Sequence, residues 1–364
     1  MALEKLSLAT MNFYAPRFEV EIENQKLAAN ISKLIMEVSI KEKLDEGVSF
    51  TLTMHDEFDM TKQEFKWLDD HRFFDVGNKI TIKMGYGSNL HSMVMGNITS
   101  IEPSFFAGET TTLTIGGQDL SYDYIKRTFP ARTFVDRKHS DIARTIASEA
   151  GLLPVIDETV KLQKIIQKDN DETYYAFLEK LKEEVGYQFS VEGQTMYFVK
   201  PGDEKKELLT LALGKDIISF RPAMRTSGLL TEVEVIGHNP RDPNRPIRGR
   251  AAAGSERPQE QGRQTGSQVL NDRVGPVKKV ISDVIVNSVE HADALARSVL
   301  NKASDTLVEG QCECIGLPQI RTGVNVRLEK MGKKFSGKYY VKETTHTIND
   351  SGYRTSFSVK RNAI

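Results

Sequence analysis

A histidine near the C-terminus is the residue of this chain whose type most readily suggests chemistry. His346 lies in the segment YYVKETTHTINDSGYRTSF, where the turn cluster NDSG separates two runs rich in Thr, Val, Tyr and Phe and so predicts a β-hairpin. If Asn349 pairs with Gly352 across the turn, His346 faces Thr355 on the apolar side of the hairpin. A general base needs a nucleophile or an acidic partner within reach, and the neighbours predicted here are hydroxyl, aromatic and aliphatic. We therefore expect a buried, hydrogen-bonded histidine in preference to a catalytic one.

Two charged clusters are weaker candidates for a metal site. The first, in MHDEFDM, consists of His55, Asp56, Glu57 and Asp59. The second, in WLDDHRFF, consists of Asp69, Asp70 and His71. Neither has a further patterned ligand set or an EF-hand glycine. We expect solvated charged stretches rather than bound metal.

The two cysteines, Cys312 and Cys314, are two residues apart in an expected strand, QCECIG. Neighbours at that spacing are poorly placed for a disulfide, and no second Cys/His pair at zinc spacing accompanies them. We expect buried thiols in a reducing compartment.

No specific catalytic or cofactor motif is present. The sequence contains no Walker loop, Rossmann glycine pattern, nucleophile elbow or metalloprotease helix. The carboxylate pair of a glycosidase is neither excluded nor supported by a chain with 50 acidic residues. The sequence thus predicts no catalytic, cofactor-binding or metal-ligating residue and no cofactor, and an enzyme stays the weaker alternative.

Composition is that of a globular protein. The chain has 364 residues, of which 39% are hydrophobic and 27% charged, enough for two or three domains. A formal net charge of -1 gives no overall attraction to nucleic acid or anionic lipid. The start of the chain lacks a cationic stretch followed by an apolar core, and no apolar run approaches the roughly 18 residues of a membrane span. We expect a protein that stays in the cytoplasm when it is made.

The hydrophobic pattern divides the chain into three parts. Residues 1–116 contain short strand-like runs typical of a β-barrel or sandwich. Residues 117–207 contain two segments with one apolar helical face, SDIARTIASEAGL and DNDETYYAFLEKLKEEVGY, each ending at a glycine, and then a hairpin. Residues 208–364 return to strands, with a helix at about 288–304. This predicts a mainly β, α+β fold in which two similar barrel-like domains flank a small α/β domain.

One stretch within the third part lacks the residues of a core. The segment at about 240–268 carries four of the 12 prolines and six arginines, with Ile247 as almost its only aliphatic residue. We expect a long surface loop that is mobile in the free subunit. It has no aromatic residues interleaved with the arginines for stacking on bases, so a protein interface ranks above an RNA or DNA contact.

The order of the pieces resembles the phage late control gene D family. The segment KITIKMGYGSNLHSMVMGNITSIEPSFFAGETTTLTIGGQDLSYDYIKRT is similar to its first domain, with a GYG turn, a G-x-I-T-x-I-x-P strand and G-x-D-L. The helix and hairpin DNDETYYAFLEKLKEEVGYQFSVEGQTMYF resemble its FL-x-x-L and E-x-G stretch. The segment EGQCECIGLPQIRTGVNVRLEKMGKKFSGKYYVKETTHTINDSGYRTSF resembles its C-terminal barrel, including G-x-P-x-I-R-x-G. The resemblance covers nearly the whole chain.

This resemblance implies a baseplate hub of a contractile phage tail or related injection system, similar to the N-terminal part of VgrG spikes. Such a hub is a homotrimer whose six similar barrels match a sixfold tail tube to a threefold spike. The implied partners are the tail tube protein, a central spike expected as a separate chain because this one stops at Ile364, and other baseplate proteins, without sequence-specific nucleic-acid binding. His346 would be a structural position. The alternatives are a tail-associated cell-wall hydrolase and a cell-surface-binding β module, and a phage tail, a tailocin and another injection device are equally open as hosts of the hub.

Overall fold

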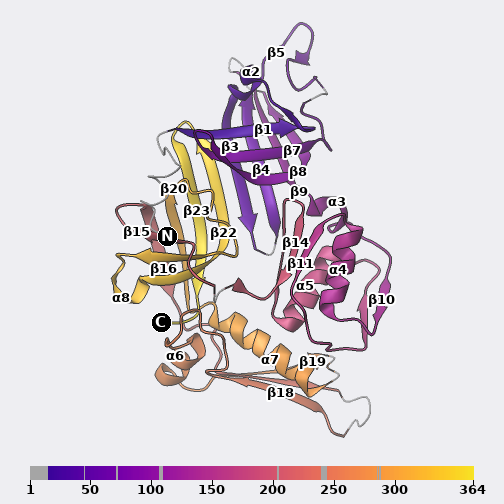
Figure 1. Ribbon diagram of the computed structural model, residues 1–364, viewed down its shortest axis with the longest axis vertical. Coiled ribbons are helices and arrows are strands. Elements are labelled where there is room, and N and C mark those ends of the chain that lie inside the picture. The colour runs from indigo at the N-terminus through magenta and orange to yellow at the C-terminus, as the bar shows by residue number, and fades with distance from the viewer. Residues whose placement is uncertain are drawn as a thin grey trace.

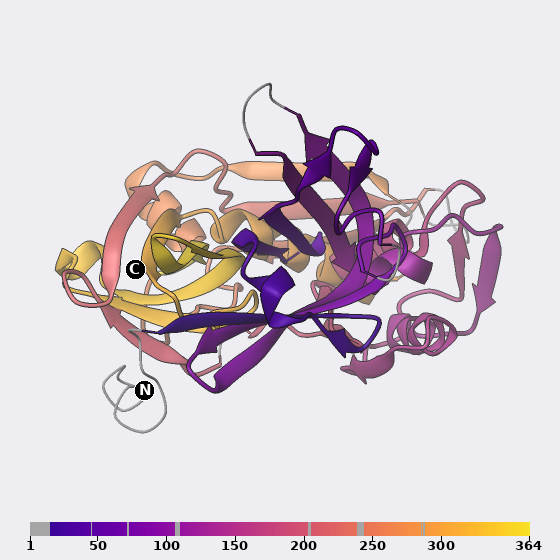
Figure 2. The ribbon, with the colours of Figure 1, turned by 90° about the horizontal axis from the view of Figure 1, so that it is seen from above.

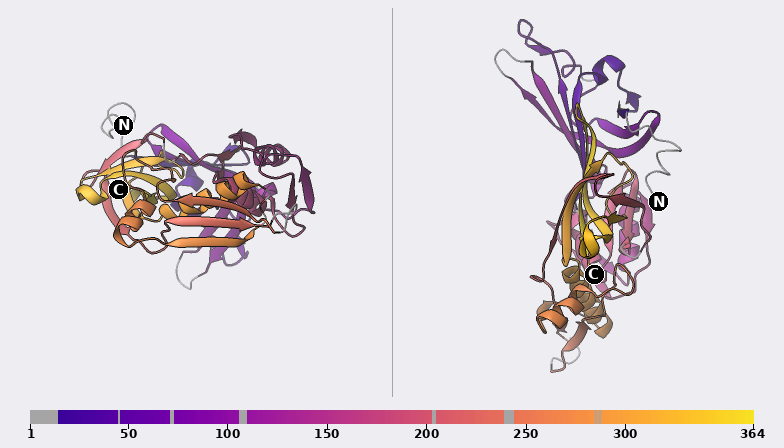
Figure 3. Two further views of the ribbon diagram at one scale, coloured as in Figure 1. Left: turned by 90° about the horizontal axis from the view of Figure 1, so that it is seen from below. Right: turned by 90° about the vertical axis from the view of Figure 1, so that its left-hand side faces the viewer.

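The computed structural model describes residues 15–44, 46–70, 73–105, 110–202, 205–238, 244–284, 286 and 288–364. The molecule is elongated, with the first β region at one end and a small sheet with helices at the other (Figure 1; Figure 3, right). Seen from above, the C-terminal strands lie to one side and the α/β part to the other (Figure 2).

A single large sheet contains strands from both β regions. From the first region come β1 (Pro16–Ile22), β2 (Gln25–Lys26), β3 (Ile35–Lys43), β4 (Gly47–His55), β7 (Lys79–Tyr86), β8 (Asn89–Ser104) and β9 (Thr112–Asp119). From the second come β15 (Leu209–Ala212), β16 (Ile217–Met224), β20 (Val308–Ile315), β21 (Asn325–Glu329), β22 (Gly337–Asn349) and β23 (Gly352–Arg361). Their order is β16-β20-β23-β22-β3-β4-β9-β8-β7-β1-β2, and β21 pairs with both β22 and β15.

The two β regions meet at β22, which is 13 residues long. Its first residues pair with β21, and its last residues pair antiparallel with β3, from Glu343 opposite Lys43 to Ile348 opposite Val38. The mainly β fold is confirmed, but the described strands form one open, largely antiparallel sheet and close no barrel. The physical reason is the length of β22, because one long strand can pair with β21 at one end and with β3 at the other.

The hairpin of β22 and β23 contributes to two separate cores. Near its tip, Ile348 and Tyr353 pack into the core of the first β region. Near its base, Val341, Phe357 and Val359 pack into the core of the second region. Alternation directs Tyr353, Phe357 and Val359 of β23 to one face, and a register irregularity between Val341 and Glu343 brings Val341 and Ile348 of β22 to the same face. One hairpin therefore joins the two cores.

The α/β part lies on one flank of the large sheet (Figure 1). Its elements are α3 (Ser121–Tyr124), β10 (Arg132–Val135), α4 (His139–Glu149), β11 (Leu153–Ile156), β12 (Ile165–Lys168), α5 (Tyr174–Val185), β13 (Gln188–Glu192) and β14 (Thr195–Val199). Both predicted helices are present, and Gly151 and Gly186, which follow them, have positive φ angles of 70° and 67°. The hydroxyl of Thr173, one residue before α5, accepts a hydrogen bond from the amide of Ala176 at 3.1 Å.

A separate three-stranded sheet occupies the lower end of the molecule (Figure 3, left). It consists of β17 (Glu232–Gly237) between β18 (Ile247–Ala252) and β19 (Lys278–Val284), with α7 (Val289–Ser304) packed along it. The remaining elements are α2 (Ala29–Ser32), β5 (Phe58–Asp59), β6 (Glu64–Phe65), α6 (Gly266–Arg273) and α8 (Gly332–Phe335). None of the described helices combines the length and apolar character that crossing a membrane requires.

The expectation of a surface loop over about 240–268 is wrong for residues 247–252 and from Gly266 onward, whereas 244–246 and 253–265 contain no helix or extended strand. Residues 247–252 form β18, which pairs antiparallel with β17, and α6 begins at Gly266. Gly249 and Ala251 are buried toward α7, while the arginines between them point outward, Arg248 to Glu234 at 2.8 Å and Arg250 to Glu232 at 2.7 Å. At Gly249 and Ala251 the residues are small because α7 packs closely against this strand. Residues 239–243 are outside the described ranges, and the division into 1–116, 117–207 and 208–364 stays a prediction.

We predict that Gly249→Ala destabilises the protein. A Cβ atom at this position would lie 2.2 Å from the carbonyl carbon of Ala292 in α7, so the helix would have to move. Overpacking of this kind typically costs roughly 1–3 kcal/mol. Thermal unfolding should show a lower melting temperature for Gly249→Ala and little change for Ala252→Ser, a small substitution on the same strand. Equal melting temperatures for the parent and Gly249→Ala would contradict the close packing of β18 on α7.

Candidate functional site

The side chain of His346 is fully buried, and both of its ring nitrogens have hydrogen-bond partners. Nε2 lies 2.9 Å from the carbonyl oxygen of Ile320, which can only accept, so Nε2 carries the hydrogen. Nδ1 lies 3.0 Å from the hydroxyl of Tyr353 and 3.1 Å from that of Thr355. The predicted pairing of His346 with Thr355 and of Ile348 with Tyr353 is confirmed.

This environment keeps the imidazole neutral. Burial lowers the pKa of His346 from its usual 6.5 to about 4, and the positive charge of Arg321 acts in the same direction. A neutral imidazole whose acceptor nitrogen is already occupied by two hydroxyl groups has no free position from which to take a proton from a substrate.

Next to the histidine lies a buried ion pair between Glu42 of β3 and Arg321 of the segment that connects β20 to β21. The guanidinium is bidentate, with Nε 2.8 Å and Nη2 3.1 Å from the two carboxylate oxygens. The same Glu42 carboxylate accepts from the amide of Thr322 at 3.1 Å and from the hydroxyl of Thr344 at 3.3 Å. Burial favours the neutral form of Glu42, but Arg321 outweighs it and the pKa of the carboxyl lies below its usual value.

Arg321 also reaches the backbone of the first β region. Its Nη1 and Nη2 donate to the carbonyl oxygens of Ser92 and Met93, at 3.3 and 3.0 Å, on β8. One arginine from the second region is thus bound to two strands of the first.

Two aromatic rings complete the cluster. The hydroxyl of Tyr86 on β7 donates to the carbonyl oxygen of Gly316 at 2.9 Å, and its ring lies 5.6 Å from that of Tyr353. Gly316 has no side chain at a position where a Cβ would lie 2.1 Å from the Tyr353 ring. Burial raises the pKa of both tyrosines, so both stay protonated as hydrogen-bond donors. We call the set Glu42, Tyr86, Arg321, His346, Tyr353 and Thr355 the polar junction.

The polar junction joins the two β regions, and its geometry is that of a structural contact. Its hydrogen bonds run from β3, β7 and β8 on one side to β22 and the 316–322 segment on the other. The arrangement can fix the relative position of these strands.

The first charged cluster supports the local backbone. Asp56 is buried rather than solvated, and its carboxylate accepts from the amides of Trp67 and Leu68, at 3.2 and 2.9 Å. Burial raises its pKa. In the second cluster the carboxylate of Asp69 accepts from the amide of Phe65, and His71 lies outside the described residues. Across the described ranges, no three His, Cys, Asp or Glu side chains gather in a way that could hold a metal ion.

Both cysteines are buried and free, as the sequence predicts. Burial raises the pKa of Cys312 to about 12 and also raises that of Cys314 well above its usual value, so both are thiols at neutral pH. A buried thiol of this kind is a poor nucleophile.

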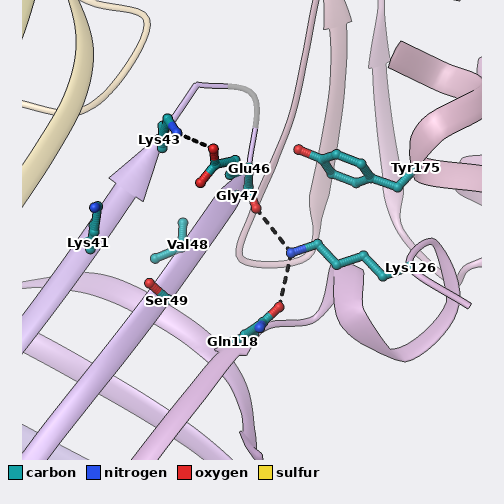
Figure 4. Close-up of a pocket in the computed structure, with 9 residues that line it drawn as sticks. All are labelled: Lys41, Lys43, Glu46, Gly47, Val48, Ser49, Gln118, Lys126 and Tyr175. Carbon is teal, nitrogen blue, oxygen red and sulfur yellow. Dashed lines mark hydrogen bonds and ion pairs between the residues drawn. The ribbon is translucent and has the colours of Figure 1, made fainter. Parts of the chain in front are cut away.

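An open pocket of about 360 Å³ lies between the β3–β4 hairpin and the α/β part (Figure 4). The amine of Lys126 donates to the carbonyl oxygen of Glu46 and to the side-chain oxygen of Gln118, each at 3.0 Å. It also lies 5.4 Å from the centre of the Tyr175 ring on α5. The lysine therefore links the first β region to the α/β part.

Sequence reasoning missed Glu42 and Arg321. A signal for Glu42 exists, because it follows Val38 and Ile40 on the same face of its strand and is therefore a charge that points inward. Its partner is 279 residues away, and nothing in the local pattern identifies it.

Comparison with known proteins gives a family and a fold. The sequence profile described as the Alg8 N-terminal domain matches residues 14–350. No curated protein matches the chain.

The chain is also similar to solved structures, among them the following three. The 43 kDa tail protein of prophage MuSo2 from Shewanella oneidensis superposes with a TM-score of 0.72 and 13% identity, over 95% of this chain and 98% of that one. The tail protein from Neisseria meningitidis MC58 superposes with a TM-score of 0.71 and 12% sequence identity, over 96% of this chain and 97% of that one. The E. coli c3393 protein superposes with a TM-score of 0.58 and 9% sequence identity, over 94% of this chain and 77% of that one. It is described as a component of the type VI secretion system with structural similarity to the bacteriophage T4 tail proteins gp27 and gp5. The chain has the fold of phage tail proteins.

We predict strong coupling between Glu42 and Arg321. Removal of one partner of a buried pair leaves an uncompensated charge and typically costs roughly 3–5 kcal/mol. Glu42→Gln and Arg321→Met should each lower the free energy of unfolding in denaturant titrations, and the double variant should lose much less than the sum. The matched control is the more exposed pair Lys41–Glu343, which joins β3 to β22, and for it a coupling of at most about 1 kcal/mol is expected. Additive losses at Glu42 and Arg321 would contradict a coupled pair.

We predict that His346 makes stability depend on pH. The unfolded chain binds a proton on this histidine near pH 6.5, whereas the folded chain binds it only near pH 4. The contribution of the neutral His346 side chain to the free energy of unfolding is therefore complete above about pH 6.5. It is lost as the pH falls from 6.5 to 4, which lowers the free energy of unfolding by roughly 3 kcal/mol in total. Unfolding free energies measured across this range should fall less steeply for His346→Gln than for the parent. The control His238→Gln, at an exposed position, should show the same slope of unfolding free energy against pH as the parent. If His346→Gln also kept that slope, the folded and unfolded chains would bind the His346 proton equally well, and the prediction would be wrong.

Proposed function

We propose that this chain, which belongs to the Alg8 N-terminal domain family, is a structural component of a contractile phage tail or a related injection machine. The observation that carries this proposal is the extent of the likeness to tail proteins. The shared fold runs from the first β region to the final hairpin, over nearly the full length of this chain and of two tail proteins. A likeness of that extent points to a whole tail component rather than to one borrowed module.

More specifically, we propose a baseplate hub of the late control gene D type. Each subunit holds two β regions in one sheet, joined at β22 and at the polar junction. A homotrimer would therefore present six β regions in fixed positions, which suits a contact between a sixfold tail tube and a threefold spike. The proposed partners are the tube protein, a central spike protein and other baseplate proteins, and the proposed location is the baseplate after synthesis in the host cytoplasm.

We also propose that the role is structural and not enzymatic. The support is the burial of His346, because both ring nitrogens bind protein groups and the imidazole stays neutral. The cell-wall hydrolase and the cell-surface-binding module gain no comparable support from the described residues.

The expected assembly is a trimer with a central channel. Closed rotational symmetry is the usual result when unlike surfaces of identical chains bind one another. Native mass spectrometry and sedimentation should give three copies for the purified chain or for its complex with the tube and spike proteins. A chain that stays monomeric at high concentration with both partners present would count against the hub.

A further inference from the structure

A basic hollow lies beside α8, on the side of the molecule away from the α/β part (Figure 1). Its volume is about 540 Å³. The lining residues are Arg263, Arg327, Glu329, Lys330, Lys333, Ser336 and Gly337. Four of the seven are cationic and one is acidic, although the whole chain has a net charge of only -1. We call this feature the α8 hollow.

Arginines at the α8 hollow converge on one carboxylate, that of Glu260. The Nη2 atom of Arg327 donates to it at 3.2 Å, and nitrogens of Arg263 and Arg361 lie 3.6 Å from its other oxygen. Arg327 also binds Glu207, with its Nη2 atom at 2.6 Å. Two carboxylates, Glu260 and Glu207, thus face three arginines, which leaves a net positive charge in this group.

The deepest of these arginines is incompletely satisfied. Arg361 is 1% exposed, and its Nε atom has no hydrogen-bond partner, as is also true of the second oxygen of Glu260. The guanidinium lies under Gly337, which lines the hollow, at 2.9 Å from where a Cβ of that glycine would be. Buried polar atoms without partners are uncommon and call for an explanation such as a bound group.

The rim of the hollow has two further cations that are not paired. Lys330 and Lys333 form no hydrogen bond or ion pair with any described residue through their side chains. Lys330 also has a φ angle of 65°, in the left-handed region that a lysine rarely adopts. Backbone outliers of this kind concentrate at binding sites.

We propose that the α8 hollow is a docking site for an acidic segment of a partner protein, whose carboxylates pair with Lys330, Lys333 and Arg263. Arginine and lysine recognise carboxylates by charge-assisted hydrogen bonds. A nucleic acid fits less well, because no aromatic ring lines the hollow for stacking on bases. This site gives a role to the segment at about 240–268, which supplies both Arg263 and Glu260. The proposal does not depend on the role of the chain in a tail.

The test is the binding of a fluorescein-labelled hexaglutamate peptide to the full chain, followed by fluorescence anisotropy. Binding should be measurable at low ionic strength and should weaken as salt is added, because the contacts are exposed to solvent. The double variant K330E/K333E should bind at least about tenfold more weakly, and K330R/K333R should retain binding. The control K33E/K279E changes the net charge equally at two exposed lysines far from the hollow and should stay within about twofold of the parent.

Three results would overturn the proposal. Failure of the parent to bind hexaglutamate at low salt would remove the site. Equal weakening in K330E/K333E and in the control would show a general effect of charge. Tighter binding of a DNA duplex or of inorganic phosphate, with the same loss in K330E/K333E, would assign the hollow to phosphate. Melting curves of all variants should match that of the parent, because the substituted side chains are exposed.

Discussion

Six consecutive residues of β22, from Glu343 to Ile348, pair with β3, and this ladder makes one sheet of the two β regions. Without this ladder, β22 would be an edge strand of the second β region and β3 an edge strand of the first. The polar junction lies on the same strands, with Glu42 on β3 and His346 on β22, and Arg321 extends the contact to β8. Most of what holds the two regions in place is therefore concentrated at one strand pair.

The chemistry of this contact favours a unique arrangement more than it favours stability. Desolvation offsets much of the attraction between buried charges, so a buried ion pair is weak evidence of a net gain in stability. A slip of one residue in the pairing of β22 with β3 would, however, turn His346 toward solvent and leave Glu42 without Thr344. The unsatisfied groups would then make the wrong register costly. We infer that the polar junction specifies the register of a strand pair that hydrophobic packing alone would hold less strictly.

The parts of the structure that the sequence predicts are those decided by near neighbours. The register that places His346 opposite Thr355 follows from a turn and an alternating pattern within 20 residues, and the helices ending before Gly151 and Gly186 follow from an apolar face and a stop signal. The predictions that failed concern features that depend on contacts between residues far apart in the chain. The strand 247–252 looks like a loop because its inward positions, Gly249 and Ala251, are small, and only the approach of α7 explains their size. The joining of two expected barrels into one sheet likewise depends on a pairing between residues about 300 positions apart in the chain.

The α/β part and the lower sheet are attached to the same centre. From the α/β part, the side chain of Gln188 on β13 hydrogen-bonds to the hydroxyl of Tyr340 on β22. From the lower sheet, Ser298 on α7 donates to the carbonyl oxygen of Glu183 on α5 at 2.8 Å, and Lys302 pairs with the carboxylate of the same glutamate at 2.8 Å. The contacts thus form a chain from β3 to β22, from β22 to the α/β part, and from there to α7. A displacement of the first β region would therefore be transmitted through β22 to the α/β part and the lower sheet.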